Sequence, residues 1–520
     1  MFLELFMLLF IEWFYFLFFI FLFVNFLVVL YNKSLRLQRI VIISRFQKYM
    51  LVTDYNLKVK EKFIFLYYKI YYFLLCLSVV YYYLYFPVNL WFCFDFLIYF
   101  DYFSAFSIVI FFIFFSLFLL INIKLNIDYM YYFEYLFIII LINFFVLFLF
   151  KVYDFLFIYI LVEGVSLCLY ILAASNYSSI KVSEAGLKYF ILAVLSSLFF
   201  LFGISVIYSI FASVNFFKIK ILCLVLNLDS FNFYKLVFAF FLIVGSFLFK
   251  LGAAPFHIWV VEVYQGVTFI TFFFFSIYSK LIFIFILFKL LFTVFLSLSS
   301  LINIIFLFFG IASICCGVVG SLIVLDVRRL LAYGSIAHVG FLLLSLINLN
   351  FYSIFSFFFY LIVYLFLMFS FFLFVLLVKG VHINTYNNLL DYTVLKTSSL
   401  FVTFFIFFIF LSMGGVPPFL GFYTKFIVLL NLLSNYVSNV YIIIFILCIN
   451  LIGIYVYLRL GVYLFFSGNA LRSFKVLSQS FSLTLLIYLF FFFNFIGFIF
   501  LPLLYNYLYI CSFYYLLCFI

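Results

Sequence analysis

The sequence predicts an all-α, polytopic membrane protein, and two observations support this class. Of the 520 residues, 72% are hydrophobic and 8% are charged, whereas soluble globular domains are about 45–50% apolar and about 25% charged. The apolar runs are continuous and reach the length of about 20 residues that a membrane-spanning helix needs. Because they do not alternate, we expect helices rather than the strands of a barrel.

Hydropathy predicts about 14 transmembrane helices along the chain. The predicted spans lie near residues 5–30, 63–86, 102–121, 133–150, 154–174, 184–213, 235–260, 267–290, 300–324, 328–348, 351–379, 399–432, 439–466 and 480–505.

Basic residues of the predicted loops gather on one side of the membrane, here called side A. Sixteen lie on side A and four on the opposite side, side B. Those of side A are Lys33, Arg36, Arg39, Arg45, Lys48, Lys58, Lys60, Lys62, Lys124, Lys181, Arg328, Arg329, Lys379, Lys396, Arg472 and Lys475, and those of side B are Lys151, Lys218, Lys220 and Lys235. By the positive-inside rule, side A faces the compartment of synthesis, and both termini face the other side. The net charge of +12 therefore reflects topology, and no nucleic-acid partner is expected.

The nine cysteines do not predict a redox or metal centre. None form a CxxC pair, and we interpret them as small apolar residues within spans. The chain has no iron–sulfur motif and no GxGxxG nucleotide loop. We therefore expect no cofactor and no metal in this chain.

Some basic residues of the spans have simple explanations. Lys69, Lys289 and Arg459 lie near span ends, where a long side chain can extend to the membrane interface. Lys188 follows Glu184 by one helical turn, which predicts an ion pair between them.

Four charged residues are deeper: Glu163, Lys250, Lys280 and Lys425. A charge at mid-bilayer costs about 2.5–3.5 kcal/mol on insertion scales. One interpretation is structural, with buried pairs that fix the register of helices. We favour an ion path, because Ser, Thr and Gly can hold membrane helices together at lower cost.

A short motif recurs beside two of these lysines. The pattern GxxPF occurs at 252–256 and again at 415–419, with Lys250 before the first copy and Lys425 after the second. Five predicted spans separate the copies, so the two helices run in opposite directions. Broken helices at matching places of two inverted halves are typical of transporters.

The prolines of the motif, Pro255 and Pro418, each remove a hydrogen bond from the helical ladder and so predict a helix break. The seventh and twelfth spans are thus expected to be discontinuous. We divide the chain accordingly into 1–132, with three spans and the basic loop 31–62; 133–297, a first five-helix repeat; 298–466, a second, inverted repeat; and 467–520, a last span and tail.

Two histidines lie near the same depth as the lysines. His257 follows the first break, and His338 lies on the tenth predicted span. Each is either a buried histidine with a fixed partner or a group that titrates near neutral pH. His382 lies in a polar loop, where we expect it to be solvated.

Five stretches together resemble chain 2 of NADH–ubiquinone oxidoreductase (respiratory complex I), the N-type antiporter-like subunit. They are "VEGVSLCLYILAA" (162–174), "EAGLKYFILAVLSS" (184–197), "KLGAAPFHIWVVEVYQG" (250–266), "VRRLLAYGSIAHVGFLLL" (327–344) and "GGVPPFLGFYTKF" (414–426). Before about residue 100 and after about residue 430, the match extends only to span number and apolarity.

The resemblance implies a membrane-arm subunit that translocates protons, coupled to electron transfer from NADH to ubiquinone in other subunits. The residues that match the family's mid-membrane path are Glu163, Lys250, Lys280, Lys425 and Lys188, and the two histidines lie beside it. The resemblance also implies that FMN, the iron–sulfur clusters and ubiquinone are bound by partner subunits. The chain would then be part of an enzyme without holding a redox centre itself.

The resemblance further implies the setting of the protein. The expected partners are other membrane-arm subunits, including the sister antiporter-like chains, together with membrane lipids and a respiratory supercomplex. The abundance of Phe and Tyr suits an AT-rich organelle genome, and no Arg-rich presequence is present. We therefore expect an organelle-encoded protein of the mitochondrial inner membrane, with both termini on the intermembrane-space side.

Alternatives remain at this stage. The sister chains 4 and 5 usually carry histidine stretches of the form PLHxWLP or HTWLPDAM, and Lys425 instead of a glutamate argues against chain 4. Here Val260, Val261 and Glu262 stand where the family has Thr-Pro-Asp, and Gly334 replaces a usual serine. Two other interpretations are a stand-alone cation/proton antiporter subunit and a structural subunit that has lost pumping.

Overall fold

The computed structural model describes nine segments, namely residues 91–93, 98–100, 102–123, 132–175, 179–225, 230–324, 326–378, 400–433 and 440–466. Two three-residue strands, β1 (Trp91–Cys93) and β2 (Ile98–Phe100), pair antiparallel, and the other elements are helical. The predicted spans 5–30, 63–86 and 480–505 and the basic loop 31–62 lie outside the described residues.

The helices form two groups that follow each other in sequence. The first group contains α3 (Tyr102–Ile123), α4 (Tyr132–Lys151), α5 (Phe155–Ala173), α6 (Ile180–Phe211), α7 (Phe216–Val225), α8 (Ser230–Leu251), α9 (Ile258–Gly266), α10 (Phe269–Phe274), η1 (Phe275–Ser279), α11 (Lys280–Thr293) and η2 (Leu296–Leu298). The second contains α12 (Ser299–Ile323), α13 (Val327–Ser345), α14 (Phe351–Val378), α16 (Leu400–Gly414), α17 (Leu420–Leu433) and α18 (Val440–Phe466).

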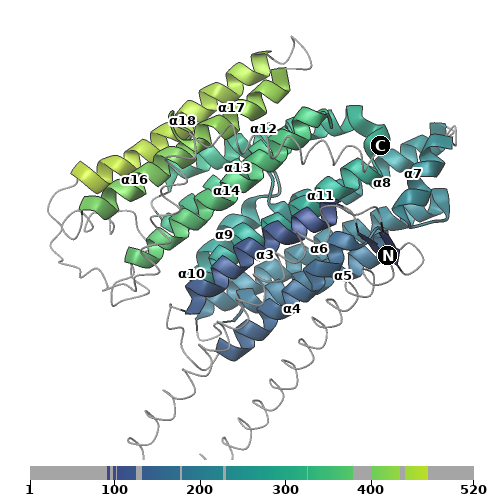
Figure 1. Cartoon of the computed structure of the whole chain (residues 1–520), viewed down its shortest axis with the longest axis horizontal. Helices are drawn as coiled ribbons and strands as arrows, with labels where there is room; N and C mark the ends of the chain where they lie inside the picture. Colours follow the sequence, from purple (N-terminus) through teal and green to yellow (C-terminus); the bar gives the residue numbers. More distant parts are fainter. Residues whose placement is uncertain are drawn as a thin grey trace, which may run out of the picture.

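The core of the molecule lies where these groups meet. In Figure 1, α4 to α6 lie at one end of the bundle and α16 to α18 at the other. The apolar segment Phe269–Thr293 is 94% buried and that of α14 is 89% buried, whereas α6 and α18 are only 39% and 33% buried. The segments of α10 to α11 and α14 are therefore the central helices, and α6 and α18 are peripheral.

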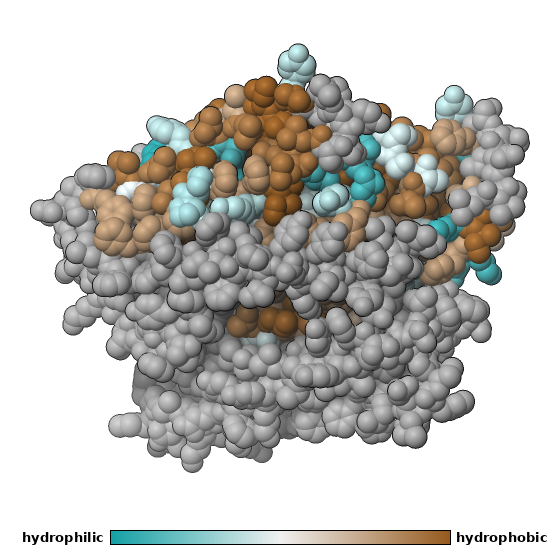
Figure 2. Space-filling model, turned by 45° about the horizontal axis from the view of Figure 1, so that its top comes forward, coloured by the Kyte–Doolittle hydropathy of each residue, from teal (hydrophilic) through white to brown (hydrophobic). Residues whose placement is uncertain are grey.

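The outer surface suits a lipid environment. Large apolar side chains such as Ile191 on α6 and Leu451 on α18 are more than 60% exposed. Figure 2 shows that the described surface of one face is mostly hydrophobic. Within the described residues, eight helices are long and apolar enough to cross a membrane. The protein is thus a multi-pass membrane protein of the predicted all-α class.

The predicted spans from the third to the thirteenth each correspond to a described helix or broken helix. The short strands β1 and β2, the turns η1 and η2, and helix α7 were not predicted. Helix α7 is too short to span a membrane, so hydropathy placed its ten residues in a loop. The π-helical turn η1 interrupts the eighth span, and such turns leave no mark on hydrophobic periodicity.

The seventh predicted span is broken, and it is broken at a glycine. Gly252 has a φ of +72°, a left-handed conformation that glycine adopts without penalty. The N–H of Ala253 donates to the Leu248 carbonyl at 3.0 Å, and that of Gly252 donates to the Phe249 carbonyl at 3.0 Å. This pair of hydrogen bonds is the Schellman termination of a helix.

The first half of the twelfth span ends in the same way. Gly415 has a φ of +84°. The N–H of Val416 donates to the Leu411 carbonyl at 3.1 Å, and that of Gly415 donates to the Ser412 carbonyl at 3.2 Å. The two discontinuous helices are therefore confirmed, with one correction. Each helix ends at the glycine, and Pro255 and Pro418 lie three residues later in the non-helical link.

Two basic residues bind the free ends of neighbouring helices. The Lys289 ammonium, on α11, donates to the carbonyls of Phe150 at 2.8 Å and Val152 at 2.6 Å, where α4 ends. The Arg459 guanidinium, on α18, donates to the Leu322 carbonyl at 2.8 Å, where α12 ends. We expected both side chains to extend to the membrane interface. Instead they satisfy carbonyls that a helix end leaves without a partner.

These two contacts are equivalent by position. One joins the eighth predicted span to the fourth, and the other joins the thirteenth to the ninth, so each pair is five spans from its counterpart. The recurrence is what two five-helix repeats would produce. The boundaries 133–297 and 298–466 stay predictions.

A third contact of this kind joins the two groups of helices. The Arg328 guanidinium, in the first turn of α13, donates to the carbonyls of Gln265 at 3.3 Å and Val267 at 2.7 Å, where α9 ends. The neighbouring Arg329 donates to the Gln265 side chain at 2.6 Å and lies 3.7 Å from Asp326. The half-helix after the first break is thus tied to the start of α13.

We predict that Gly252→Ala lowers the thermal stability of the detergent-solubilised protein, while Gly245→Ala on the same helix does not. A side chain at +72° is strained by about 1–2 kcal/mol, and the new Cβ would overlap the Val260 side chain. A Cβ at Gly245 meets no atom within 4 Å. Equal melting temperatures for the two variants would contradict the proposed role of the left-handed glycine.

We also predict that Lys289→Met destabilises the protein more than Arg459→Met does. The first variant frees two carbonyls and the second frees one, and each buried polar group without a partner costs about 1–3 kcal/mol. Melting temperatures of the two variants would be compared with that of Lys218→Met, a substitution of an exposed lysine on α7 that should be neutral.

Candidate functional site

A buried ion pair lies directly before the first break. Lys250 is in the last turn of α8, and its ammonium is 3.5 Å from the Glu163 carboxylate on α5. The lysine side chain is 4% exposed and the carboxylate 21% exposed. The Ser166 hydroxyl donates to the other carboxylate oxygen at 3.3 Å. The structure thus brings together two residues that the sequence separates by 87 positions.

Lys188 lies apart from this pair, on the outer surface. Its ammonium is 2.9 Å from Glu184, as predicted, and 2.8 Å from Glu262. All three side chains are about half exposed, and we name them the exposed ion cluster. Glu262 is the residue that replaces the family's aspartate, and here it joins α9 to α6. The place of Lys188 in the path stays a prediction.

Lys280 lies at the centre of the molecule, where η1 passes into α11. It is 2% exposed, and its ammonium nitrogen has no hydrogen-bond partner among the described residues. A π-helical turn often marks a functional site, because it displaces the side chains that follow. The arrangement leaves this amine free to accept or give up a proton.

Lys425 binds the helix end at the second break. Its ammonium donates to the carbonyls of Gly414 at 2.6 Å and Met413 at 3.3 Å, the last residues of α16. It also donates to the Asn450 side-chain oxygen on α18 at 2.7 Å. A cation at the C-terminus of a helix is stabilised by the helix dipole as well as by the free carbonyls. The lysine after the second break therefore has a different environment from the lysine before the first.

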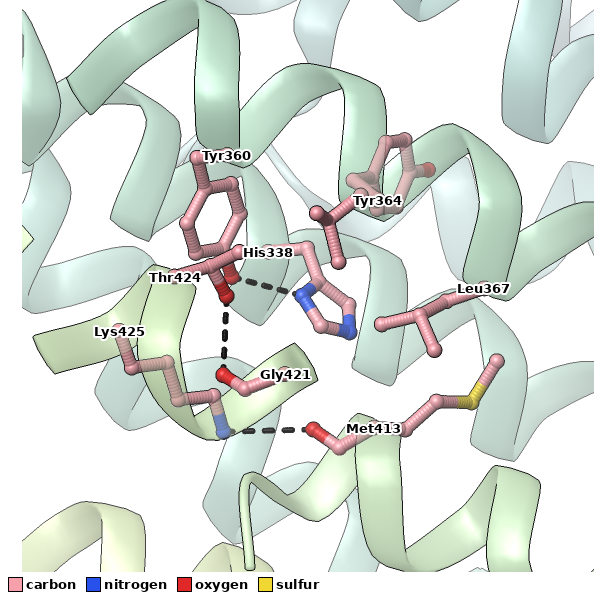
Figure 3. A pocket seen from close by; sticks show the side chains of 9 residues that line it. His338, Tyr360, Tyr364, Leu367, Met413, Gly421, Thr424 and Lys425 are labelled. Atoms are coloured by element: carbon pink, nitrogen blue, oxygen red, sulfur yellow. Dashed lines mark hydrogen bonds between the residues drawn. The ribbon is translucent and has the colours of Figure 1, made fainter. Parts of the chain in front are cut away.

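A narrow crevice connects Lys425 to His338. It is lined by His338, Tyr360, Val363, Tyr364, Leu367, Met413, Gly421, Thr424 and Lys425. Figure 3 shows the hydrogen bond between the His338 ring and the Tyr360 hydroxyl, whose length is 2.7 Å. The crevice does not admit a water molecule in its present packing. Side chains would have to move before a water could enter.

His338 also links the two halves of the site. It lines the same crevice as Lys425. Tyr364, whose ring centre is 5.3 Å from that of His338, donates to the Ser276 carbonyl in η1 at 2.7 Å. His338 therefore shares a crevice with Lys425 and is joined through Tyr364 to η1, the turn that directly precedes Lys280.

His257 belongs to the surface of the first break. Its side chain is partly exposed, and its Nδ1 lies 3.3 Å from the Pro255 carbonyl. It does not contact the buried lysines in the described structure. His382 lies outside the described residues.

Sequence reasoning missed three groups of this site, Tyr360, Tyr364 and Asn450. The tyrosines stand four residues apart in the Phe-rich span "FFFYLIVYLF", which places both hydroxyls on one face of α14. Asn450 is a single amide within the apolar stretch "ILCINLIG". Hydroxyl and amide groups within a span need partners, so each of these residues could have been predicted to bind a polar group of another helix.

Taken together, the candidate site is a set of buried or partly buried ionisable groups that lie beside the two breaks and at the centre of the molecule. It comprises the Glu163–Lys250 pair, Lys280, His338 and Lys425. Amines, an imidazole and a carboxylate exchange protons without any cofactor. Within the described residues, no group of three or more His, Cys, Asp or Glu side chains could hold a metal ion.

We predict that Glu163→Gln and Lys250→Met each lower the melting temperature more than the double variant does. Removing one partner leaves the other charge buried without its counter-ion, whereas removing both does not. Thermal denaturation of the three variants in detergent checks this. Additive effects would show that the two side chains, at 3.5 Å, do not act as a pair.

Comparison with known proteins places this site within a family. A family model described as NADH:quinone oxidoreductase/Mrp antiporter, transmembrane, matches residues 152–453. The chain is 31% identical over 284 residues to NADH-quinone oxidoreductase subunit N of Ruthia magnifica subsp. Calyptogena magnifica, covering 54% of this chain and 58% of that protein. It is 30% identical over 282 residues to NADH-ubiquinone oxidoreductase chain 2 of Marchantia polymorpha, covering 54% and 57%.

The matched region spans less than two thirds of these relatives' lengths. A chain of the respiratory complex I of Thermus thermophilus, solved with bound aureothin, shares the fold with a TM-score of 0.61 at 21% identity, covering 77% of this chain and 86% of that one. The resemblance seen in the five sequence stretches is thereby confirmed. The family model covers more than half of the residues and includes both breaks and the ionisable groups of the candidate site, so the chain belongs to the NADH:quinone oxidoreductase/Mrp antiporter transmembrane family.

Proposed function

We propose that the chain is the chain 2 (subunit N) component of an NADH:ubiquinone oxidoreductase and translocates protons across the membrane. The observation that carries the proposal is the set of buried ionisable groups that lie beside the two breaks and at the centre of the molecule. Buried charges within membrane spans are rare and mark ion or proton paths. The names of the relatives, subunit N and chain 2, support the choice of complex.

In the proposed mechanism, Lys250 alternates between two states. Beside Glu163, at 3.5 Å, its protonated form is stabilised by the carboxylate. When that pair opens, burial disfavours the charged amine and the proton leaves. Moving one charge against 100 mV costs about 2.3 kcal/mol. A change in proton affinity of about 1.7 pH units has the same free energy. Forming and breaking the ion pair with Glu163 can supply a free-energy change of about this size.

In this mechanism the other buried ionisable groups carry the proton between the two breaks. Lys280 has no hydrogen-bond partner among the described residues and can accept a proton. His338 lines the same crevice as Lys425 and can exchange a proton with it in either direction. Lys425 holds it at the end of α16. The exposed ion cluster with Lys188, and His257 at the surface of the first break, would then contribute at the entrance or at an interface.

The proposed setting is the one that the composition and the sequence resemblance suggested. The protein would be a multi-pass, organelle-encoded subunit of the mitochondrial inner membrane, with both termini on the intermembrane-space side. Electron transfer through FMN, the iron–sulfur clusters and ubiquinone would take place in partner subunits. Its neighbours would be the other membrane-arm subunits, including the sister antiporter-like chains, with membrane lipids around them and a respiratory supercomplex as the larger assembly.

A second candidate is a stand-alone cation/proton antiporter subunit. The family model covers Mrp antiporters as well as NADH:quinone oxidoreductases, and the same lysines would serve either. A native gel of source membranes in mild detergent separates the two, with this chain identified by mass spectrometry. We expect it in the large band that oxidises NADH. Its presence only in smaller, NADH-inactive bands would favour the antiporter.

We predict that Lys250→Ala abolishes proton translocation in membrane vesicles that contain the assembled complex. The measurement is the proton uptake driven by NADH, followed with a pH-sensitive dye. Lys218→Ala removes an exposed lysine of α7 and should leave the signal unchanged. Normal pumping by a fully assembled Lys250→Ala complex would refute the proton path and favour a structural subunit.

A further inference from the structure

The ammonium of Lys425 is held by three oxygen atoms from two different helices. Two are the carbonyls of Gly414 and Met413 at the end of α16, at 2.6 and 3.3 Å. The third is the side-chain oxygen of Asn450 on α18, at 2.7 Å. A protonated lysine has three N–H donors and no acceptor. The three oxygens therefore match the charged form of this lysine and no other.

The other groups that face Lys425 do not replace this third acceptor. From α13 and α14, His338, Tyr360 and Tyr364 line the crevice on the opposite side. From α18, Tyr457 lies against Gly414, and from α13 the Phe341 ring is 5.4 Å from the ammonium. The described part of α16 contains no titratable residue. No carboxylate contacts the ammonium among the described residues, so the neutral amide is the side chain that completes its shell.

The repeated architecture gives this position a counterpart. Asn450 lies nine residues before Arg459 on α18, and Lys280 lies nine residues before Lys289 on α11. Because Lys289 and Arg459 bind equivalent helix ends, Asn450 and Lys280 occupy equivalent places in the two halves. One half carries a proton-accepting amine at this place, and the other carries an amide that binds the neighbouring amine.

We propose that Asn450 is a positioning residue, which holds protonated Lys425 against the end of α16 and sets the pH at which that lysine releases its proton. The inference rests on the proposed function. On release, an N–H bond of Lys425 breaks and the nitrogen keeps the electron pair. The proton passes to the His338 imidazole, or to a water that enters the crevice when its side chains move.

The neutral amine fits the same cage poorly. It has two N–H donors and one lone pair, and a lone pair facing a carbonyl oxygen is repelled. Lys425 must then turn from at least one of its three oxygens, and the crevice offers the open direction. Asn450 therefore couples the charge of Lys425 to its position, which is the property that a proton-carrying side chain needs for a directed step.

The test is the pH dependence of NADH-driven proton translocation in vesicles that contain the assembled complex. Asn450→Leu removes the third acceptor, so Lys425 should lose its proton more readily. The pH at which pumping falls on the alkaline side should then move down. Asn450→Asp has the same size and adds a negative charge, which favours the protonated lysine, so that pH should move up. A hydrogen bond to a charged group corresponds to about one to two pH units.

Opposite shifts from two variants of similar size would not arise from a merely structural role. Cys448→Ala, at an exposed position of the same helix, should keep the profile of the unmodified complex. Unchanged profiles, or shifts in the same direction, would overturn the role of Asn450. If Asn450→Leu does not assemble, the isosteric Asn450→Asp decides alone, because only an alkaline shift agrees with the inference.

Lys425→Gln separates this inference from the proposed function. If Lys425→Gln pumps normally, the path does not pass through Lys425 and the proposed function fails at this step. If Lys425→Gln stops pumping while both Asn450 variants keep the unmodified profile, the path stands and only the role of Asn450 is wrong.

Discussion

Free carbonyls at the C-terminal ends of helices are the constraint on which much of this structure depends. Lipid offers them no donor, so the protein must supply one. Lys289, Arg328, Arg459 and Lys425 each reach from one helix to the end of another and donate to such carbonyls. These contacts fix how far neighbouring helices slide past each other. They also let cations lie within a bundle that holds few carboxylates.

The two breaks share one backbone geometry but place their lysines in different chemical surroundings. At each break the helix ends at a left-handed glycine with the same pair of hydrogen bonds. Lys250 lies before its break and faces the Glu163 carboxylate, whereas Lys425 lies after its break and faces carbonyl and amide oxygens. A carboxylate can itself change charge, but a carbonyl cannot. The first lysine therefore has a partner that can titrate with it, and the second has a fixed receptor for its charged form.

Much of the fold was predictable, because a membrane restricts the choice of structure. Long apolar runs can only be helices, and the glycine and proline of GxxPF must interrupt one. The errors came from contacts across the sequence. Lys289 and Arg459 were expected to extend to the interface. Their real partners lie on other helices, up to 139 residues away, and periodicity carries no information about such distances.

The sequence by itself determined the class of the protein, the places of its spans from the third to the thirteenth, the two breaks and the identity of the buried charges. Composition and local backbone preference are enough for these, since each depends on neighbouring residues. Only the tertiary structure decided which charges meet. It paired Glu163 with Lys250, placed His338 in a crevice with Lys425, and gave Lys425 an amide from α18. Proton affinity depends on the atoms within a few ångströms, and those atoms come from distant parts of the chain.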